Sequence, residues 1–103
     1  MIRVHIDPDA LWFRMEGHAD FGPVGSDIVC AAATMLASTL ISSTHDRVAD
    51  GEVQQCCLQP GKAMLHVTPK RRRVREACKV MFESTHRGFR LLAQSYPDNI
   101  IID

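Results

Sequence analysis

Residues 11–41, LWFRMEGHADFGPVGSDIVCAAATMLASTLI, decide the fold. In residues 11–16 the apolar side chains fall at every second position, which is typical of a β-strand with one buried face. Residues 28–41 are rich in alanine and leucine and contain no glycine or proline, which predicts a helix. Between them, residues 19–25 hold two glycines and a proline, which fit neither element and predict a loop. The order in this stretch is therefore strand, loop, helix.

The ends of these two elements carry the first candidate functional residues. Gly17-His18 follows the strand directly, so His18 is expected at a strand end. Ser26 or Asp27 can cap the helix with a side-chain oxygen. Either cap places Cys30 in the first helical turn.

The flanking sequence repeats the same kinds of element. Residues 2–6 alternate and end at Asp7-Pro8-Asp9, a strong turn signal, so they should form a hairpin with the strand at 11–16. The other expected elements are strands at 53–59 and 63–68 joined by a proline-glycine turn, a long helix from Thr68-Pro69 to Tyr96 weakened at Gly88, and a short strand at 100–102. These predict an α+β fold, a small mixed sheet with two helices in the order β-β-α-β-β-α, followed by a short C-terminal strand.

Composition limits the class of protein. The 103 residues are 46% hydrophobic, which is enough for one domain over 1–103 and too little for two. Formal charge is zero, which argues against a dedicated nucleic-acid or membrane-surface protein. Residues 1–60 nevertheless hold three basic and eight acidic side chains, and residues 61–103 hold nine and four. The chain is therefore electrically polarised along its length.

Localisation is expected to be cytoplasmic. No apolar run approaches the roughly 20 residues of a membrane span, and the first ten residues lack the features of a secretory signal. The four cysteines should then be free thiols in a reducing compartment. Cys56 and Cys57 are neighbours on a strand, so one should face the core and the other solvent, while Cys78 lies on the apolar stripe of the second helix.

His18 and Cys30 form the strongest candidate for chemistry. A thiol attacks only as the thiolate, and the positive end of a helix stabilises a thiolate in its first turn. An imidazole can take the thiol proton and return it to a leaving amine, and first-turn N–H groups can hold an oxyanion. Alternatively, Cys30 is a small packing residue and His18 a turn histidine. Spacing alone does not decide between these interpretations.

A family resemblance favours the catalytic interpretation. Gly17-His18-Ala19, the glycine-bearing loop and Gly25-Ser26-Asp27-Ile28-Val29-Cys30-Ala31-Ala32 resemble the signature of the ribosomal-processing cysteine protease family, Prp or YsxB-like. The likeness extends over nearly the whole chain. It implies that His18 and Cys30 are a catalytic dyad, in a homodimer that removes the N-terminal extension of a large-subunit ribosomal protein by cutting after an aromatic pair.

Other residues near these motifs have two interpretations each. Asp27 either caps the helix or orients His18 as a third catalytic member, and we favour the cap. Gly22, Pro23 and Gly25 form turns, and the same segment can act as a lid over the site. Family members often carry serine four residues after the cysteine, where this chain has Thr34, so a supporting role for its hydroxyl is less secure.

No metal or organic cofactor is expected, because the cysteines and histidines lack the spacing of a zinc site. A cationic run, Lys70, Arg71, Arg72, Arg73 and Arg75, lies at the start of the second helix. Cations there oppose the helix dipole, so helix stability does not explain them. They form either a solvated face or a weak contact with RNA or the ribosome. The alternative to a protease is a non-enzymatic ribosome- or RNA-associated module that binds through this run.

Overall fold

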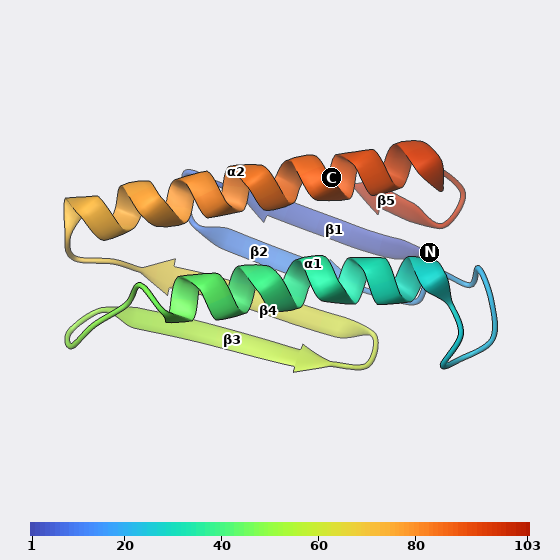
Figure 1. The fold of residues 1–103 in the computed structure, drawn as a ribbon, viewed down its shortest axis with the longest axis horizontal. Coiled ribbons are helices and arrows are strands. Elements are labelled where there is room, and N and C mark those ends of the chain that lie inside the picture. The colour runs from blue at the N-terminus through green and yellow to red at the C-terminus, as the bar shows by residue number, and fades with distance from the viewer.

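Five strands and two helices make up the computed structural model, which describes residues 1–103. The elements are β1 (Ile2–Asp7), β2 (Trp12–Glu16), α1 (Ile28–His45), β3 (Val53–Gln59), β4 (Lys62–Thr68), α2 (Arg72–Ser95) and β5 (Ile100–Ile102). Both helices lie on one face of the sheet, side by side and antiparallel (Figure 1). The predicted α+β class, the order of the elements and the short final strand are confirmed.

The sheet order is β3-β4-β2-β1-β5. Its antiparallel part consists of the two predicted hairpins, which join where β2 pairs with β4. β5 instead pairs in parallel with β1, with Ile2 opposite Ile100, so the sheet is mixed as predicted. This order brings the end of β2 beside the β3–β4 turn, which positions the candidate site.

The core lies between the helices and the sheet. Alternate strand residues such as Val4, Phe13 and Leu65 are fully buried, and α2 covers them with Phe82 and Phe89. The rings of Phe13 and Phe89 stack with their centroids 5.6 Å apart. Each large side chain buried in this way contributes roughly 1.5–3 kcal/mol, so this layer supplies much of the stability.

The helix α1 buries its sheet-facing side, which consists of Val29, Ala33, Ala37, Leu40 and Thr44. By length and composition alone α1 is apolar enough to cross a membrane, contrary to the expectation from the sequence. That property is weak support for a membrane span, because the core helix of a soluble protein shares it. Here α1 packs as a core helix.

The helix α1 continues four residues beyond the predicted end at Ile41, to His45. Gln54 of β3 donates its amide to the carbonyl oxygen of Ile41 and to the hydroxyl of Thr44, each at 2.8 Å. These long-range bonds satisfy polar groups in the last turn, which the local sequence did not reveal.

The predicted start of α2 at Thr68-Pro69 is wrong. Strand β4 continues through Thr68, and α2 begins at Arg72 with Arg71 as an N-cap that makes no side-chain capping bond. The carboxylate of Glu52 accepts the backbone N–H groups of Lys70 and Arg71, the two residues that precede the helix. Residues 69–71 are therefore held in a connection, and the helix starts after them.

The expected long second helix runs through Gly88 without a break. A Cβ atom at this position would lie 2.7 Å from Cδ2 of Leu36, on α1. Glycine therefore permits the close approach of the two helices, which compensates for its low helix propensity.

The expected split between Cys56 and Cys57 is also incorrect. Cys56 pairs with buried Leu65 and shares its face of the sheet, yet Cys56 is exposed and Cys57 is half-buried. The reason is that β3 is an edge strand with no buried residue, which the helices do not cover completely. Cys78 is fully buried, as its place on the apolar stripe predicted.

Candidate active site

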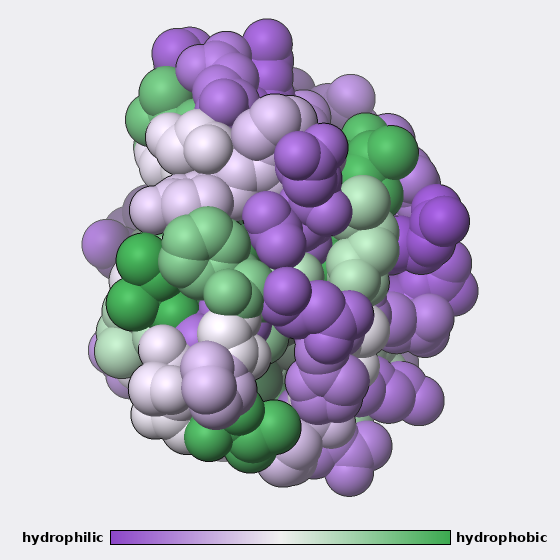
Figure 2. Space-filling model, turned by 90° about the vertical axis from the view of Figure 1, so that its right-hand side faces the viewer, coloured by the Kyte–Doolittle hydropathy of each residue, from purple (hydrophilic) through white to green (hydrophobic).

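A cleft of about 710 Å³ opens where β2 ends, α1 begins and the β3–β4 turn reverses the chain. Both His18 and Cys30 line it. Asp27, Thr34 and the loop glycines Gly22 and Gly25 also line the cleft, whereas Pro23 does not. Figure 2 views the molecule from this end, where separate hydrophobic patches interrupt a mostly polar surface. The structure thus gathers most of the sequence-predicted site residues in one place.

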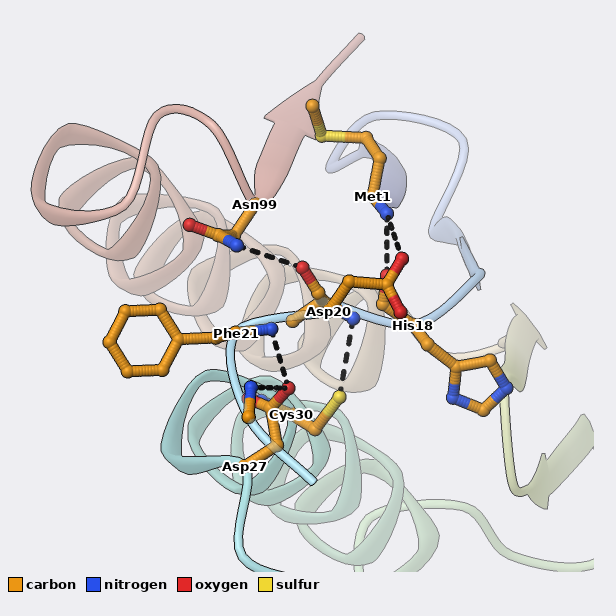
Figure 3. Close-up of polar contacts among 9 residues, drawn as sticks. Met1, His18, Asp20, Phe21, Asp27, Cys30 and Asn99 are labelled. Atoms are coloured by element: carbon orange, nitrogen blue, oxygen red, sulfur yellow. Dashed lines mark hydrogen bonds and ion pairs between the residues drawn. The ribbon is translucent and has the colours of Figure 1, made fainter. Parts of the chain in front are cut away.

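Cys30 is half-buried in the first turn of α1. Its Sγ accepts a hydrogen bond from the backbone N–H of Ala19, with 3.3 Å between nitrogen and sulfur (Figure 3). This contact holds the sulfur against the loop that follows His18.

Asp27 is a buried carboxylate that joins the loop to the helix. Its Oδ1 accepts the N–H groups of Val29 and Cys30 at 3.0 Å, which caps α1. Its Oδ2 accepts the N–H groups of Phe21 and Gly22 at 2.9 and 3.1 Å (Figure 3). The hydrogen bond from Cys30 is the main cause that lowers the pKa of Asp27. Because both oxygens are occupied by the backbone, Asp27 does not orient His18.

The same bonds correct the expected source of oxyanion donors. The first-turn N–H groups of Val29 and Cys30 are held by the Asp27 side chain, and the N–H of Ala31 donates to the carbonyl oxygen of Asp27. None of these three groups is free to bind a substrate oxygen in this arrangement. The free first-turn donors expected at a helix start have been used for capping.

His18 lies on the opposite side of the cleft from the helix. Its imidazole makes no hydrogen bond and points toward the β3–β4 turn, away from the sulfur of Cys30 (Figure 3). The sulfur is nevertheless within reach. Backbone geometry places Cα of His18 about 2.4 Å from the nitrogen of Ala19, and hence within about 6 Å of the sulfur. The ring must turn about the side-chain torsions of His18 to reach the thiol.

The loop at 19–25 is anchored at its beginning and open at its tip. Asn99 donates its side-chain amide to the carbonyl oxygen of Ala19 at 2.9 Å, and the rings of Phe21 and Tyr96 meet edge to face. Val24 is fully exposed at the tip, and Gly25 has a φ of +89° with open space around it. The tip is a turn closed by the N–H of Ser26, which donates to the carbonyl oxygen of Pro23 at 3.0 Å. A role of this tip as a lid stays a prediction.

Sequence reasoning missed three contributors to this site. Ala19 supplies the N–H at the sulfur, Asn99 holds that residue from 80 positions away, and Gly61 lies against the imidazole. Ala19 stands in the Gly17-His18-Ala19 motif, but an alanine side chain gives no sign of a role for its N–H. The proline-glycine turn was the one signal that marked Gly61. Thr34 lines the cleft without a side-chain hydrogen bond. No three His, Cys, Asp or Glu side chains gather in a metal-binding cluster.

Solved structures share this fold. The chain superposes on an essential ribosomal processing protease Prp from S. aureus in complex with a covalently linked product peptide, with a TM-score of 0.81, 21% identity and coverage of 100% and 98% of the two chains. For the S. aureus Prp protease in complex with a substrate peptide, the TM-score is 0.73 and the identity 20%, with coverage of 100% of this chain and 98% of the other. For the Streptococcus mutans protein SMU.848, the TM-score is 0.71 and the identity 23%, with coverage of 100% of this chain and 92% of the other.

Sequence comparison identifies a family but no individual curated relative. No curated protein sequence matches the chain significantly. The profile of one family, described as cysteine protease Prp, matches residues 1–101, which is almost the full length and includes both motifs around His18 and Cys30. The chain therefore belongs to the cysteine protease Prp family.

Proposed function

We propose that this protein is a cysteine endopeptidase that removes the N-terminal extension of a large-subunit ribosomal protein. Membership of the cysteine protease Prp family supports the peptidase activity. The structural neighbour from S. aureus is described as a ribosomal processing protease, and it has been seen with a substrate peptide and with a covalently linked product peptide. We assign the same class of substrate to this chain.

One observation carries the assignment of roles. The sulfur of Cys30 accepts the N–H of Ala19 in a cleft that His18 also lines. A sulfur nucleophile and an imidazole in one cleft are the combination that peptide-bond cleavage by a cysteine requires. Cys30 is therefore the nucleophile, and His18 is the general base and acid.

In the first half-reaction, the thiol proton of Cys30 moves to the imidazole of His18. The thiolate attacks the carbonyl carbon of the scissile peptide bond and forms a C–S bond, so that negative charge moves to the carbonyl oxygen. The imidazolium then gives its proton to the leaving amine nitrogen as the C–N bond breaks. The product is an acyl-enzyme with a thioester at Cys30 and a released peptide with a new N-terminus.

In the second half-reaction, a water molecule attacks the thioester carbon, and His18 accepts the proton that the water loses. The C–S bond breaks, and the sulfur leaves as thiolate together with a carboxylic acid product, which restores the starting enzyme after proton return. The N–H of Ala19 donates to the sulfur in the free enzyme, and we assign it to the oxyanion of each tetrahedral intermediate, in which the sulfur is bonded to carbon and no longer needs that donor.

The cleft suits an uncharged segment of substrate. Its apolar lining is supplied by Ile2, Met15, Val24, Ala31 and Leu58. No lysine or arginine lines it, and its acidic groups are exposed Asp20 and the internally bonded Asp27. A cleft of this size and lining accommodates large apolar side chains. This chemistry agrees with cleavage after an aromatic pair, as the family resemblance implies.

The test is hydrolysis of a synthetic peptide that spans the junction of the extended ribosomal protein from the same organism. Cys30→Ala should abolish cleavage while the circular dichroism spectrum stays unchanged, because alanine is a good helix former. His18→Ala should lower kcat by at least about 100-fold, the usual scale for a positioned acid-base group. His5→Ala is the matched control on the uncovered face of the sheet and should cleave normally. Turnover by Cys30→Ala would refute the role of the nucleophile.

We further propose that two copies form a homodimer in the cytoplasm. The edge strand β3 contains no charged side chain and exposes Val53 and Leu58, and no helix covers the back of the sheet. An edge of this kind is usually protected by charge or by a partner. Light scattering after gel filtration should give twice the chain mass. A monomer at micromolar concentration would argue against this assembly.

A contact with ribosomal RNA is the remaining proposal, and it keeps the basic run as an accessory to the peptidase. Within that run, Arg71 is paired with Glu52 and Arg72 with Glu76, whereas Arg73 and Arg75 are exposed and form no ion pair. Replacing Arg73 and Arg75 with glutamine should weaken binding to ribosomal particles and flatten its salt dependence, without slowing peptide cleavage. Unchanged binding would identify the run as a solvated face.

A further inference from the structure

The imidazole of His18 rests directly against the β3–β4 turn. A Cβ atom built on Gly61 would lie 2.8 Å from Nε2 and 3.1 Å from Cε1 of His18. Heavy atoms of this kind do not approach so closely, so any side chain at position 61 would displace the ring. Glycine at this turn therefore leaves the space that the imidazole occupies.

The backbone links the same two segments. Gly17, the residue before His18, donates its N–H to the carbonyl oxygen of Gly61 at 2.9 Å. The end of β2 and the β3–β4 turn are thus held in register on both sides of the imidazole. A change at the turn is transmitted to His18 through a short, direct contact.

We propose that Gly61 is a positioning residue for His18, which seats the imidazole at the rim of the cleft and leaves it free to turn toward Cys30. The proposal rests on the function assigned above and adds a third segment of chain to the catalytic machinery. With no hydrogen bond of its own, the imidazole depends on packing for its position, and Gly61 is the residue against which it packs.

The turn has its own requirement for glycine, which the experiment must separate from this role. Gly61 follows Pro60 with a φ of +77°, as expected for the third position of a type II turn. Gly51 provides a matched control, because its φ is +85° and an added Cβ would meet only the flexible end of Lys70, at 3.3 Å. Gly51→Ala therefore reproduces the backbone strain without contact with His18.

The test is a double-mutant cycle between Gly61→Ala and His18→Ala. In the wild-type background Gly61→Ala should lower kcat at least about tenfold with little change in KM, whereas Gly51→Ala should change kcat less than about twofold. In the His18→Ala background the added methyl group meets no ring. There, Gly61→Ala should leave the residual rate unchanged and lower Tm no more than Gly51→Ala does.

Two measurements keep the result independent of the substrate. The Tm values of the four proteins in the cycle can be compared even if no peptide is cleaved. The NMR resonance of the His18 imidazole is the second measurement, and it should shift in Gly61→Ala but not in Gly51→Ala. Gly61→Asn, which tolerates a positive φ, replaces Gly61→Ala if that variant does not fold. The proposal would be overturned if Gly61→Ala lowered kcat by the same factor in the wild-type and His18→Ala backgrounds, or if it left the imidazole resonance unchanged. Absence of wild-type cleavage alone would count against the proposed function instead.

Discussion

Asn99 donates its side-chain amide to the carbonyl oxygen of Ala19 across 80 positions of sequence, at 2.9 Å. Ala19 in turn directs its own N–H at the sulfur of Cys30. The residue before β5 is thereby connected to the nucleophile through a single intervening residue. The position of the thiolate donor depends on a residue that lies outside both sequence motifs.

Removing this amide should disturb the site more than the fold. We expect Asn99→Ala to lower stability by about 1 kcal/mol, the usual net value of one hydrogen bond, and to lower kcat severalfold because Ala19 loses its anchor. Asn99→Asp should behave similarly, because an ionised carboxylate cannot donate to a carbonyl oxygen. Urea unfolding and peptide cleavage measure the two effects. Full activity in both variants would show that Ala19 is held by other contacts.

Two variants of Asp27 should separate its hydrogen bonds to the start of α1 from its hydrogen bonds to the loop. In Asp27→Asn the amide oxygen can still accept from Val29 and Cys30, but the amide nitrogen cannot accept the N–H groups of Phe21 and Gly22. Asparagine is also a good N-cap, so we expect a smaller loss of Tm in Asp27→Asn than in Asp27→Ala, with reduced kcat in both. Thermal unfolding and cleavage assays compare the pair. Equal Tm values in the two variants would contradict this division of roles.

Glu52 should make stability fall in acid. Its side chain is almost completely buried, and its hydrogen bonds with Arg71 are the main cause that lowers its pKa from 4.5 to about 2. A lowered carboxyl pKa in the folded state means that the ionised form stabilises folding. This stabilisation is complete above about pH 4.5, where the unfolded carboxyl is also ionised, and is lost as the pH falls to about 2.

The measurement is the urea midpoint of wild type and Glu52→Gln between pH 7 and pH 2.5. The difference in urea midpoint between the two proteins should be largest at pH 7 and should become smaller below pH 4.5, because glutamine does not titrate. Glu76→Gln, at an exposed surface pair with Arg72, is the control and should lie close to wild type throughout. A gap that is constant across this range would exclude Glu52 as the titrating group.

The four thiols should react in a fixed order. At pH 6.5 we expect iodoacetamide to modify Cys30 first, because it is the proposed nucleophile and shares the cleft with His18, and Cys56 next, because it is exposed. Cys78 should react last, since it is fully buried and burial is the main cause that raises its pKa. Peptide mapping at several times gives the order, and His18→Ala should slow labelling at Cys30 alone. Faster labelling of Cys56 would contradict an activated Cys30.

Features of the fold that depend on neighbouring residues were predictable from the sequence. Alternation in β1, β2 and β4 and the alanine-rich run of α1 are local patterns, so the elements and their order were predicted correctly. The start of α2 was not, because Glu52 holds the backbone of Lys70 and Arg71 ahead of the helix, and it lies 18 and 19 positions before these two donors. A contact over this separation leaves no local signal.

The same distinction applies to the candidate site. His18 and Cys30 were selected by motif and by their places at a strand end and a helix start, and their catalytic roles stay predictions. The orientation of the imidazole against Gly61 follows from the pairing of three strands, which no short stretch of sequence specifies. The capping of α1 by Asp27 was predicted, but its hydrogen bonds to Phe21 and Gly22 in the loop were not.

The parallel pairing of β5 with β1 has a consequence for the order in which the molecule becomes reactive. Ile2 and Ile100 lie near opposite ends of the chain, and contacts at this sequence separation form slowly. Asn99, which immediately precedes β5, reaches Ala19 across a similar separation. A chain whose synthesis has not yet reached residue 99 lacks the anchor of the donor at Cys30, so we expect full activity only after β5 has docked.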